Sequence, residues 1–195
     1  MQSPIAIDQN RAIDRHFGEL QFSTDYYQGQ SADVTNTGHT VEVKILNNNS
    51  VPVIYGGGLK NEYALASFHF HWGSEHVINR RRYPLEGHFV HFARNYKSFQ
   101  NALNFKDGIV VLATFYNVVT KTPNLAFDPI ISEIPKVAHD VNRPVQLQDP
   151  IILNNFFPSN TRNFFRYQGS LTTPNCNEVV TWILFPTPSY ISPSQ

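Results

Sequence analysis

Three histidines in two apolar segments are the residues of this sequence best suited to chemistry. Residues 68–72 are Phe-His-Phe-His-Trp, and His88 lies in a similar apolar run at 87–91. Successive strand side chains point to opposite faces of a sheet, so His69 and His71 share one face. A neighbouring antiparallel strand can add His88. Three imidazoles without thiolates favour a catalytic zinc site with a fourth position open to water, because structural zinc sites are usually closed by four protein ligands.

Two residues near the third histidine can be placed by the same strand parity. Glu86 lies two residues before His88 and shares its face, so its carboxylate can accept the ring N–H of His88 and fix the tautomer. The alternative is a surface glutamate at the start of a strand. His91 lies three residues after His88 and should face away from the metal.

The remaining pattern predicts a sheet that positions these residues. Val41, Val43 and Ile45 alternate with polar residues, which is typical of a half-buried strand. Asp128-Pro129 can open a short helix that ends before Pro135. Further strands are expected at 66–72, 87–92, 108–116 and 179–185, with turns at 47–50 and 56–58. The sequence predicts a mainly β (α+β) fold, with a large, mostly antiparallel sheet and few short helices.

Length and composition limit the number of domains and the classes of partner that the chain can have. A chain of 195 residues with 41% hydrophobic residues favours one domain over residues 1–195. Only 15% of residues are charged and the formal net charge is zero, so nothing indicates a nucleic-acid partner. No apolar stretch is long enough to span a membrane, and the first residues show no signal peptide.

Six segments, taken together and in order, resemble the α-class, or eukaryotic-type, carbonic anhydrases. They are QSPI (2–5), NTGH (36–39), FHFHWG (68–73), SEH (74–76), EGHFVH (86–91) and GSLTTP (169–174). The resemblance implies a central twisted sheet with a metal in a conical cleft. It also implies a monomeric carbonate dehydratase, a zinc lyase that reversibly hydrates carbon dioxide to bicarbonate and a proton.

The resemblance implies a role for each matching residue. His69, His71 and His88 would hold Zn²⁺, and Glu86 would support His88. Thr172 and Glu75 would orient the zinc-bound nucleophile, and Thr173 would contact bicarbonate from the other side. His39 would pass the proton to buffer, for which an ordinary histidine pKa is suitable; the alternative is an exposed loop histidine. His76 is expected to be a buried hydrogen-bonding residue and not a ligand. The matched positions are His39, His69, His71, Glu75, His76, Glu86, His88, Thr172 and Thr173.

Four apolar positions match the carbon dioxide pocket of the family, although each could equally be ordinary core: Val90, Val111, Leu171 and Trp182. One supporting position differs from the family. Ser67 stands where the family usually has a glutamine beside the first ligand, and its short hydroxyl is expected to reach His69 only through water.

The ends of the chain and its cysteine also bear on the resemblance. Both ends look truncated relative to the family. Cys176 is the only cysteine. It stands where secreted and membrane-anchored relatives place half of a disulfide, and the alternative is a free, buried thiol. The sequence gives no compartment.

Two rival functions remain open. One is a catalytically weak or silent binding module on the same fold; relatives of that kind typically lose a metal histidine, and this chain has all three. The other is an unrelated zinc hydrolase, which the absence of a His-Glu-x-x-His motif disfavours.

Overall fold

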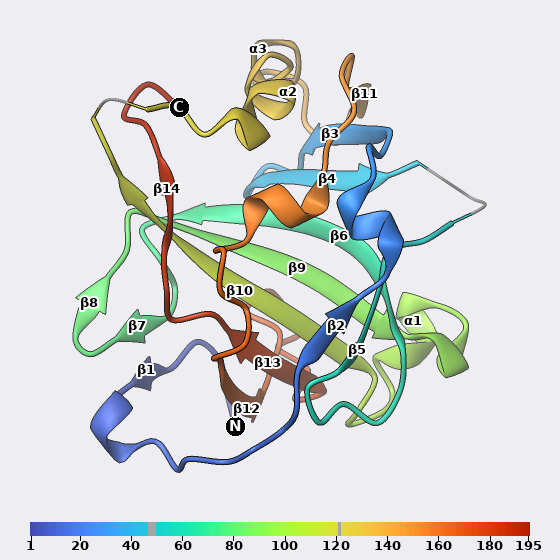
Figure 1. Ribbon diagram of the computed structural model, residues 1–195. Helices are drawn as coiled ribbons and strands as arrows, with labels where there is room; N and C mark the ends of the chain where they lie inside the picture. Colours follow the sequence, from blue (N-terminus) through green and yellow to red (C-terminus); the bar gives the residue numbers. More distant parts are fainter. Residues whose placement is uncertain (47–49, 121) are drawn as a thin grey trace.

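One large sheet organises the molecule (Figure 1). The computed structural model describes residues 1–46, 50–120 and 122–195, and within them the sheet has eleven strands. Its main path is β11-β3-β4-β6-β9-β10-β13-β12, with β5 joining β2 to β6 and β14 pairing with β10. The strands are β2 (Leu20–Phe22), β3 (Ala32–Asn36), β4 (Val41–Ile45), β5 (Val53–Gly56), β6 (Tyr63–Trp72), β9 (Leu85–Ala93), β10 (Ile109–Val118), β11 (Val145–Gln146), β12 (Phe165–Gly169), β13 (Val180–Leu184) and β14 (Ser189–Ile191).

The central strands β6, β9 and β10 pair antiparallel, as expected for a mostly antiparallel sheet. A bulge shifts the register of β6 between Leu65 and Ser67, just before the first histidine. β10 pairs parallel with β13 and β14, so the sheet is mixed. The expected mainly β class and all five expected strands are confirmed.

The helices are short and lie at the margins of the sheet. α1 (Phe99–Ala102) follows β9, α3 (Ile134–Val137) contacts β3, and α2 (Asp128–Ile131) packs next to α3 (Figure 1). As expected, Asp128-Pro129 opens a helix that ends before Pro135, which lies in the first turn of α3. Single 3₁₀ turns occur at η1 (Gln9–Arg11), η2 (Thr24–Tyr27), η3 (Arg94–Tyr96), η4 (Leu125–Phe127) and η5 (Leu153–Phe156).

The two faces of the central strands bury different side chains. Phe68, Phe70 and Phe89 pack with Phe156 in an aromatic core on one face. The intervening residues of β6 and β9 face the other way, where Val90 joins a second apolar cluster. Strand alternation therefore separates the histidines from the main core.

Smaller features complete the fold. A three-stranded sheet of β1 (Ala6–Ile7), β7 (Val77–Ile78) and β8 (Arg81–Arg82) lies beside the large sheet. The expected turn at 56–58 is present, and its three glycines have positive φ. The turn expected at 47–50 falls on residues 47–49, which are outside the described residues. Among the described residues, no helix is both long and apolar enough to cross a membrane.

Candidate metal centre

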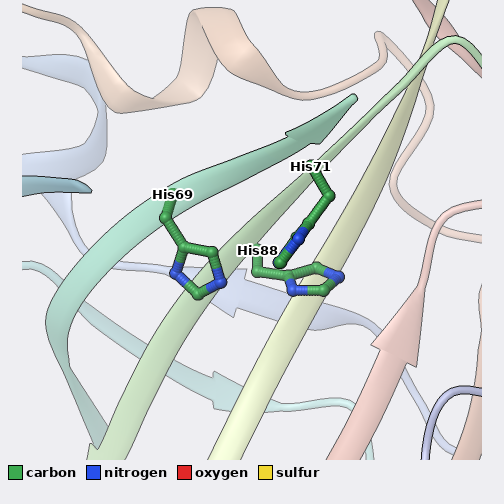
Figure 2. Close-up of side chains that lie close together, drawn as sticks. All are labelled: His69, His71 and His88. Carbon is green, nitrogen blue, oxygen red and sulfur yellow. The ribbon is translucent and has the colours of Figure 1, made fainter. Parts of the chain in front are cut away.

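The three histidines predicted as ligands converge. His69 and His71 lie on β6, and His88 lies directly opposite His69 on β9. Their ring centroids are 5.0 Å (His69–His71), 5.2 Å (His69–His88) and 4.6 Å (His71–His88) apart. One nitrogen from each ring lies within 4.8 Å of the other two, and Figure 2 shows the rings gathered on one side of the strands. The spacing suits three ligands of one ion.

The state of these rings also fits a metal. His71 Nε2 is buried and has no hydrogen-bond partner among the described residues, and such a buried group is costly unless something else binds it. Burial, with the neighbouring His88 and His71, lowers the pKa of His69 to about 2. Burial and His88 likewise lower the pKa of His71. Neutral imidazoles keep their lone pairs free, as metal binding requires.

Glu86 holds the third ring. Its Oε1 lies 2.7 Å from His88 Nε2, which leaves Nδ1 of His88 for the metal. Burial would raise the pKa of Glu86, but the rings and hydrogen bonds of His88 and His76 outweigh burial and hold the pKa below its usual range. Because Glu86 is fully buried, the interpretation as a surface glutamate is wrong.

His76 is a buried hydrogen-bonding residue, as expected. Its Nδ1 lies 2.7 Å from Glu86 Oε1 and its backbone N–H donates to Glu86 Oε2. His76, Glu86 and His88 could geometrically hold an ion, but both rings already share Glu86 Oε1. The other ring nitrogen of His76 lies 2.7 Å from the hydroxyl of Tyr167 on β12. Sequence reasoning missed Tyr167, which lies in no recognisable motif.

Glu75 lies close to two of the three histidines His69, His71 and His88 (the histidine trio), but Glu75 and Thr172 do not pair with each other. The Glu75 carboxylate lies 3.7 Å from His71 Nδ1 and 3.9 Å from His88 Nδ1. Its Oε2 is buried and finds no hydrogen-bond partner within residues 1–46, 50–120 and 122–195. In the part of the chain that the structure describes, no hydrogen bond joins Glu75 to Thr172. The expected pairing is therefore not formed here, and the role of each residue stays a prediction.

The loop that carries Thr172 follows β12. Thr172 is half-buried and Thr173 is exposed. The loop is closed by backbone hydrogen bonds from Leu171 to Asn177 and from Cys176 to Thr173. Cys176 is free and exposed, so its interpretation as a buried thiol is wrong.

Three of the four apolar positions that match the family's carbon dioxide pocket form a continuous apolar wall across three strands. Val111 on β10 lies between Val90 on β9 and Trp182 on β13 in the strand register. The Trp182 ring lies 4.9 Å from the His88 ring. All three side chains are buried in the second apolar cluster, and Leu171 packs against the same cluster. The structure thus brings these four residues together beside His88.

Two further residues singled out in the sequence, His39 and Ser67, lie outside the histidine trio. His39 is exposed in the turn between β3 and β4. The next residue, Thr40, donates a hydrogen bond to the carbonyl of Phe70, between two of the histidines, and so ties this turn to β6. Ser67 donates to Glu42 Oε1 at 2.9 Å.

Comparison with known proteins agrees with this arrangement. The chain matches the family model of eukaryotic-type carbonic anhydrase over residues 1–195. It is 34% identical over 209 residues to a Caenorhabditis elegans protein named putative carbonic anhydrase 5, with all of this chain and 64% of that protein covered. Human carbonic anhydrases 3 and 7 are each 32% identical, over 202 and 203 residues, with all of this chain and 75% and 74% of those proteins covered.

These matches extend over the whole chain, and identities above 30% accompany the converging histidines. The resemblance seen in the six sequence segments is confirmed. The chain belongs to the eukaryotic-type carbonic anhydrase family.

Proposed function

We propose that this chain is a zinc-dependent carbonate dehydratase, which reversibly hydrates carbon dioxide to bicarbonate and a proton. The observation that carries the proposal is the convergence of His69, His71 and His88, with the Nε2 of His71 buried and unpartnered. Zinc fits this donor set, because three neutral imidazoles are a known ligand set of catalytic zinc. When bound, zinc would make water acidic enough to act as a nucleophile at neutral pH, a chemistry for which carbonic anhydrases are themselves the standard example.

The side chains around the trio would control the substrate and the nucleophile. Val90, Val111, Leu171 and Trp182 form an apolar wall beside His88, which suits a small nonpolar molecule such as carbon dioxide. The indole N–H of Trp182 donates to the Ser170 carbonyl at 3.0 Å, so this polar group is already satisfied and the wall presents apolar surface to the substrate.

Polar residues around the trio would orient the reactants and remove the proton. If the Thr172 hydroxyl donates its hydrogen bond to the Glu75 carboxylate, the Thr172 oxygen can accept a hydrogen bond from the nucleophile. Thr173, on the same loop, would donate to bicarbonate. His39 is exposed on a turn tied to β6, so its ring can exchange protons with buffer.

A catalytically weak or silent binding module is the second candidate. The observation that favours it is the lack of a hydrogen bond between Glu75 and Thr172 in the described structure. The ligand trio and the apolar wall favour the enzyme.

Stopped-flow measurement of carbon dioxide hydration decides between the two. Zinc-loaded protein should accelerate hydration above the buffer rate, and removal of zinc by a chelator should abolish the acceleration. Protein that binds one zinc per chain but hydrates no faster than buffer would establish the binding module instead.

A further inference from the structure

A chain of hydrogen bonds leads from the third histidine to the N-terminal segment. It connects His88 to Glu86, Glu86 to His76, His76 to Tyr167 and Tyr167 to Ser3. The four steps are each 2.7 or 2.8 Å long. The members come from β9, the loop before β7, β12 and the N-terminal segment, which are far apart in sequence. Local strand geometry alone does not produce such a connection.

The donor and acceptor needs of the groups give this chain a direction. An ionised carboxylate only accepts hydrogen bonds, so Glu86 Oε1 accepts one from the Nε2–H of His88 and one from the Nδ1–H of His76. A neutral His76 protonated at Nδ1 has a bare Nε2, which needs a donor. The Tyr167 hydroxyl is 2.7 Å away and supplies one. Burial raises the pKa of Tyr167, which keeps that hydroxyl protonated.

Ser3 completes the chain at its outer end. The Tyr167 hydroxyl lies 2.8 Å from Ser3 Oγ, so the two hydroxyl groups are hydrogen-bonded to each other. Ser3 and Ser170 also exchange two hydrogen bonds: Ser3 N–H donates to Ser170 Oγ at 2.9 Å, and Ser170 N–H donates to Ser3 Oγ at 3.0 Å. Ser170 is fully buried and begins the loop that carries Thr172.

The backbone leaves room for this contact. A Cβ atom added at Gly169 would clash with Ser3 Oγ and would lie 2.6 Å from the Tyr167 ring. Gly169 therefore admits the N-terminal segment to the end of β12, since any larger residue would push Ser3 away.

We propose that Tyr167 and Ser3 are positioning residues for the metal centre, which act through His76 and Glu86 to hold the ring of His88 with its Nδ1 toward the metal. Through Ser170, the same serine ties the N-terminal segment to the loop that carries Thr172. The N-terminal segment thus supports both the ligand and the loop proposed to orient the nucleophile. This inference rests on the proposed role of His88 as a ligand.

The test is the affinity and visible absorption spectrum of bound Co²⁺, which report on the ligand sphere without any activity assay. Glu86→Gln removes the direct partner of His88 and should weaken Co²⁺ binding by about 10–100-fold, the usual effect of a group that bonds a ligand. Tyr167→Phe acts two bonds further out and should weaken it by roughly 3–10-fold, and Ser3→Ala by about threefold. Each should shift the Co²⁺ spectrum in the same order.

Tyr96→Phe is the matched control. Tyr96 is also a half-buried tyrosine, and its hydroxyl donates to Asp107 Oδ1 at 2.8 Å, in a different hydrogen-bond network. The Tyr96→Phe variant should lose about as much thermal stability as Tyr167→Phe, but its Co²⁺ affinity and spectrum should stay unchanged. Ser3→Ala deletes only one oxygen, so it keeps the test decisive if Tyr167→Phe folds poorly.

The outcomes separate the inference from the proposed function. A graded loss along Glu86, Tyr167 and Ser3 with an unchanged control supports the inference. If Tyr167→Phe and Ser3→Ala bind Co²⁺ with the same affinity and spectrum as Tyr96→Phe, the inference is overturned, while the proposed metal centre remains in place. A wild-type chain that binds no Co²⁺ overturns the proposed function and the inference together.

Discussion

The strands and the loops hold their parts of this site in different ways. On the strands, His69, His71 and His88 are fixed by sheet register, and His88 is also hydrogen-bonded to a fully buried carboxylate. On the loops, Glu75 has a buried oxygen without a partner and Thr172 forms no described hydrogen bond with it. The proposed metal ligands are thus preorganised, whereas the residues proposed to orient the nucleophile are not paired with each other.

This difference separates two functions within one site. Holding an ion needs only the strand residues, and rigid strands place ligands more reproducibly than loops do. The proposed hydration of carbon dioxide would also need the loop residues in a defined arrangement. Metal binding and turnover should therefore respond to different substitutions, and the following predictions test that separation.

The largest effect is expected from His71→Ala on the strand side. Removing one of three nitrogen ligands should abolish stoichiometric zinc binding, a larger loss than the 10–100-fold typical of a supporting residue. Zinc content after gel filtration measures it. His139→Ala, an exposed histidine away from the trio, is the control and should retain one zinc. Full zinc content in His71→Ala would contradict the ligand assignment.

Loop substitutions should lower turnover while the ion stays bound. Glu75→Gln and Thr172→Val each remove a partner in the proposed orientation of the nucleophile, and each should reduce kcat/KM for hydration on the order of 100-fold. Zinc content measured in parallel should stay at one per chain. Loss of zinc in Glu75→Gln would instead show that this carboxylate binds the metal, and unchanged rates in both variants would remove the proposed role.

His39→Ala should have a smaller effect. If His39 passes the proton to buffer, its loss should slow hydration roughly tenfold in dilute buffer, less than the 10²–10⁴-fold typical of a group that transfers a proton in the transition state. Concentrated imidazole buffer should restore the rate, because it replaces the missing proton acceptor. A rate that is low in both buffers would indicate damage to the site instead.

His91 provides a comparison on the opposite face of β9. Burial lowers its pKa to about 3, below the ordinary value of about 6.5 in an unfolded chain. The unfolded chain takes up this proton first, so stability should fall as pH drops below about 6.5, by about 1.4 kcal/mol per pH unit from this residue.

Urea denaturation of metal-free protein across this pH range measures the effect. His91→Gln keeps a polar group near Tyr26 but cannot titrate, so the free energy of unfolding should depend less steeply on pH. Because both proteins retain the three ligand histidines, the difference in slope isolates His91. Equal slopes would contradict the burial argument.

The contrast between strand residues and loop residues also explains which features could be predicted from the sequence. Strand parity placed His69 and His71 on one face and His91 on the other, because a two-residue period needs no knowledge of distant contacts. The parity of Glu86 and His88 predicted their hydrogen bond for the same reason. Apolar runs located β6, β9, β10 and β13 to within a few residues.

Loop geometry and distant pairings were beyond local pattern. Tyr167 on β12 lies opposite Trp182 on β13, and the His76 ring packs against Trp182, so the contact between Tyr167 and His76 depends on strand pairing that no short segment contains. Thr172 matches a motif, but a motif does not determine whether its hydroxyl meets Glu75. Local pattern likewise could not predict that Cys176 is exposed, because its exposure depends on how the surrounding loop folds.

X-ray absorption spectroscopy of the zinc-loaded protein at neutral pH tests the central claim most directly. Three imidazole nitrogens at about 2.0–2.1 Å and one exchangeable oxygen are predicted, since a catalytic zinc site keeps one position open. Fewer than three imidazoles around the ion, or a fourth protein ligand that closes the site, would contradict the account.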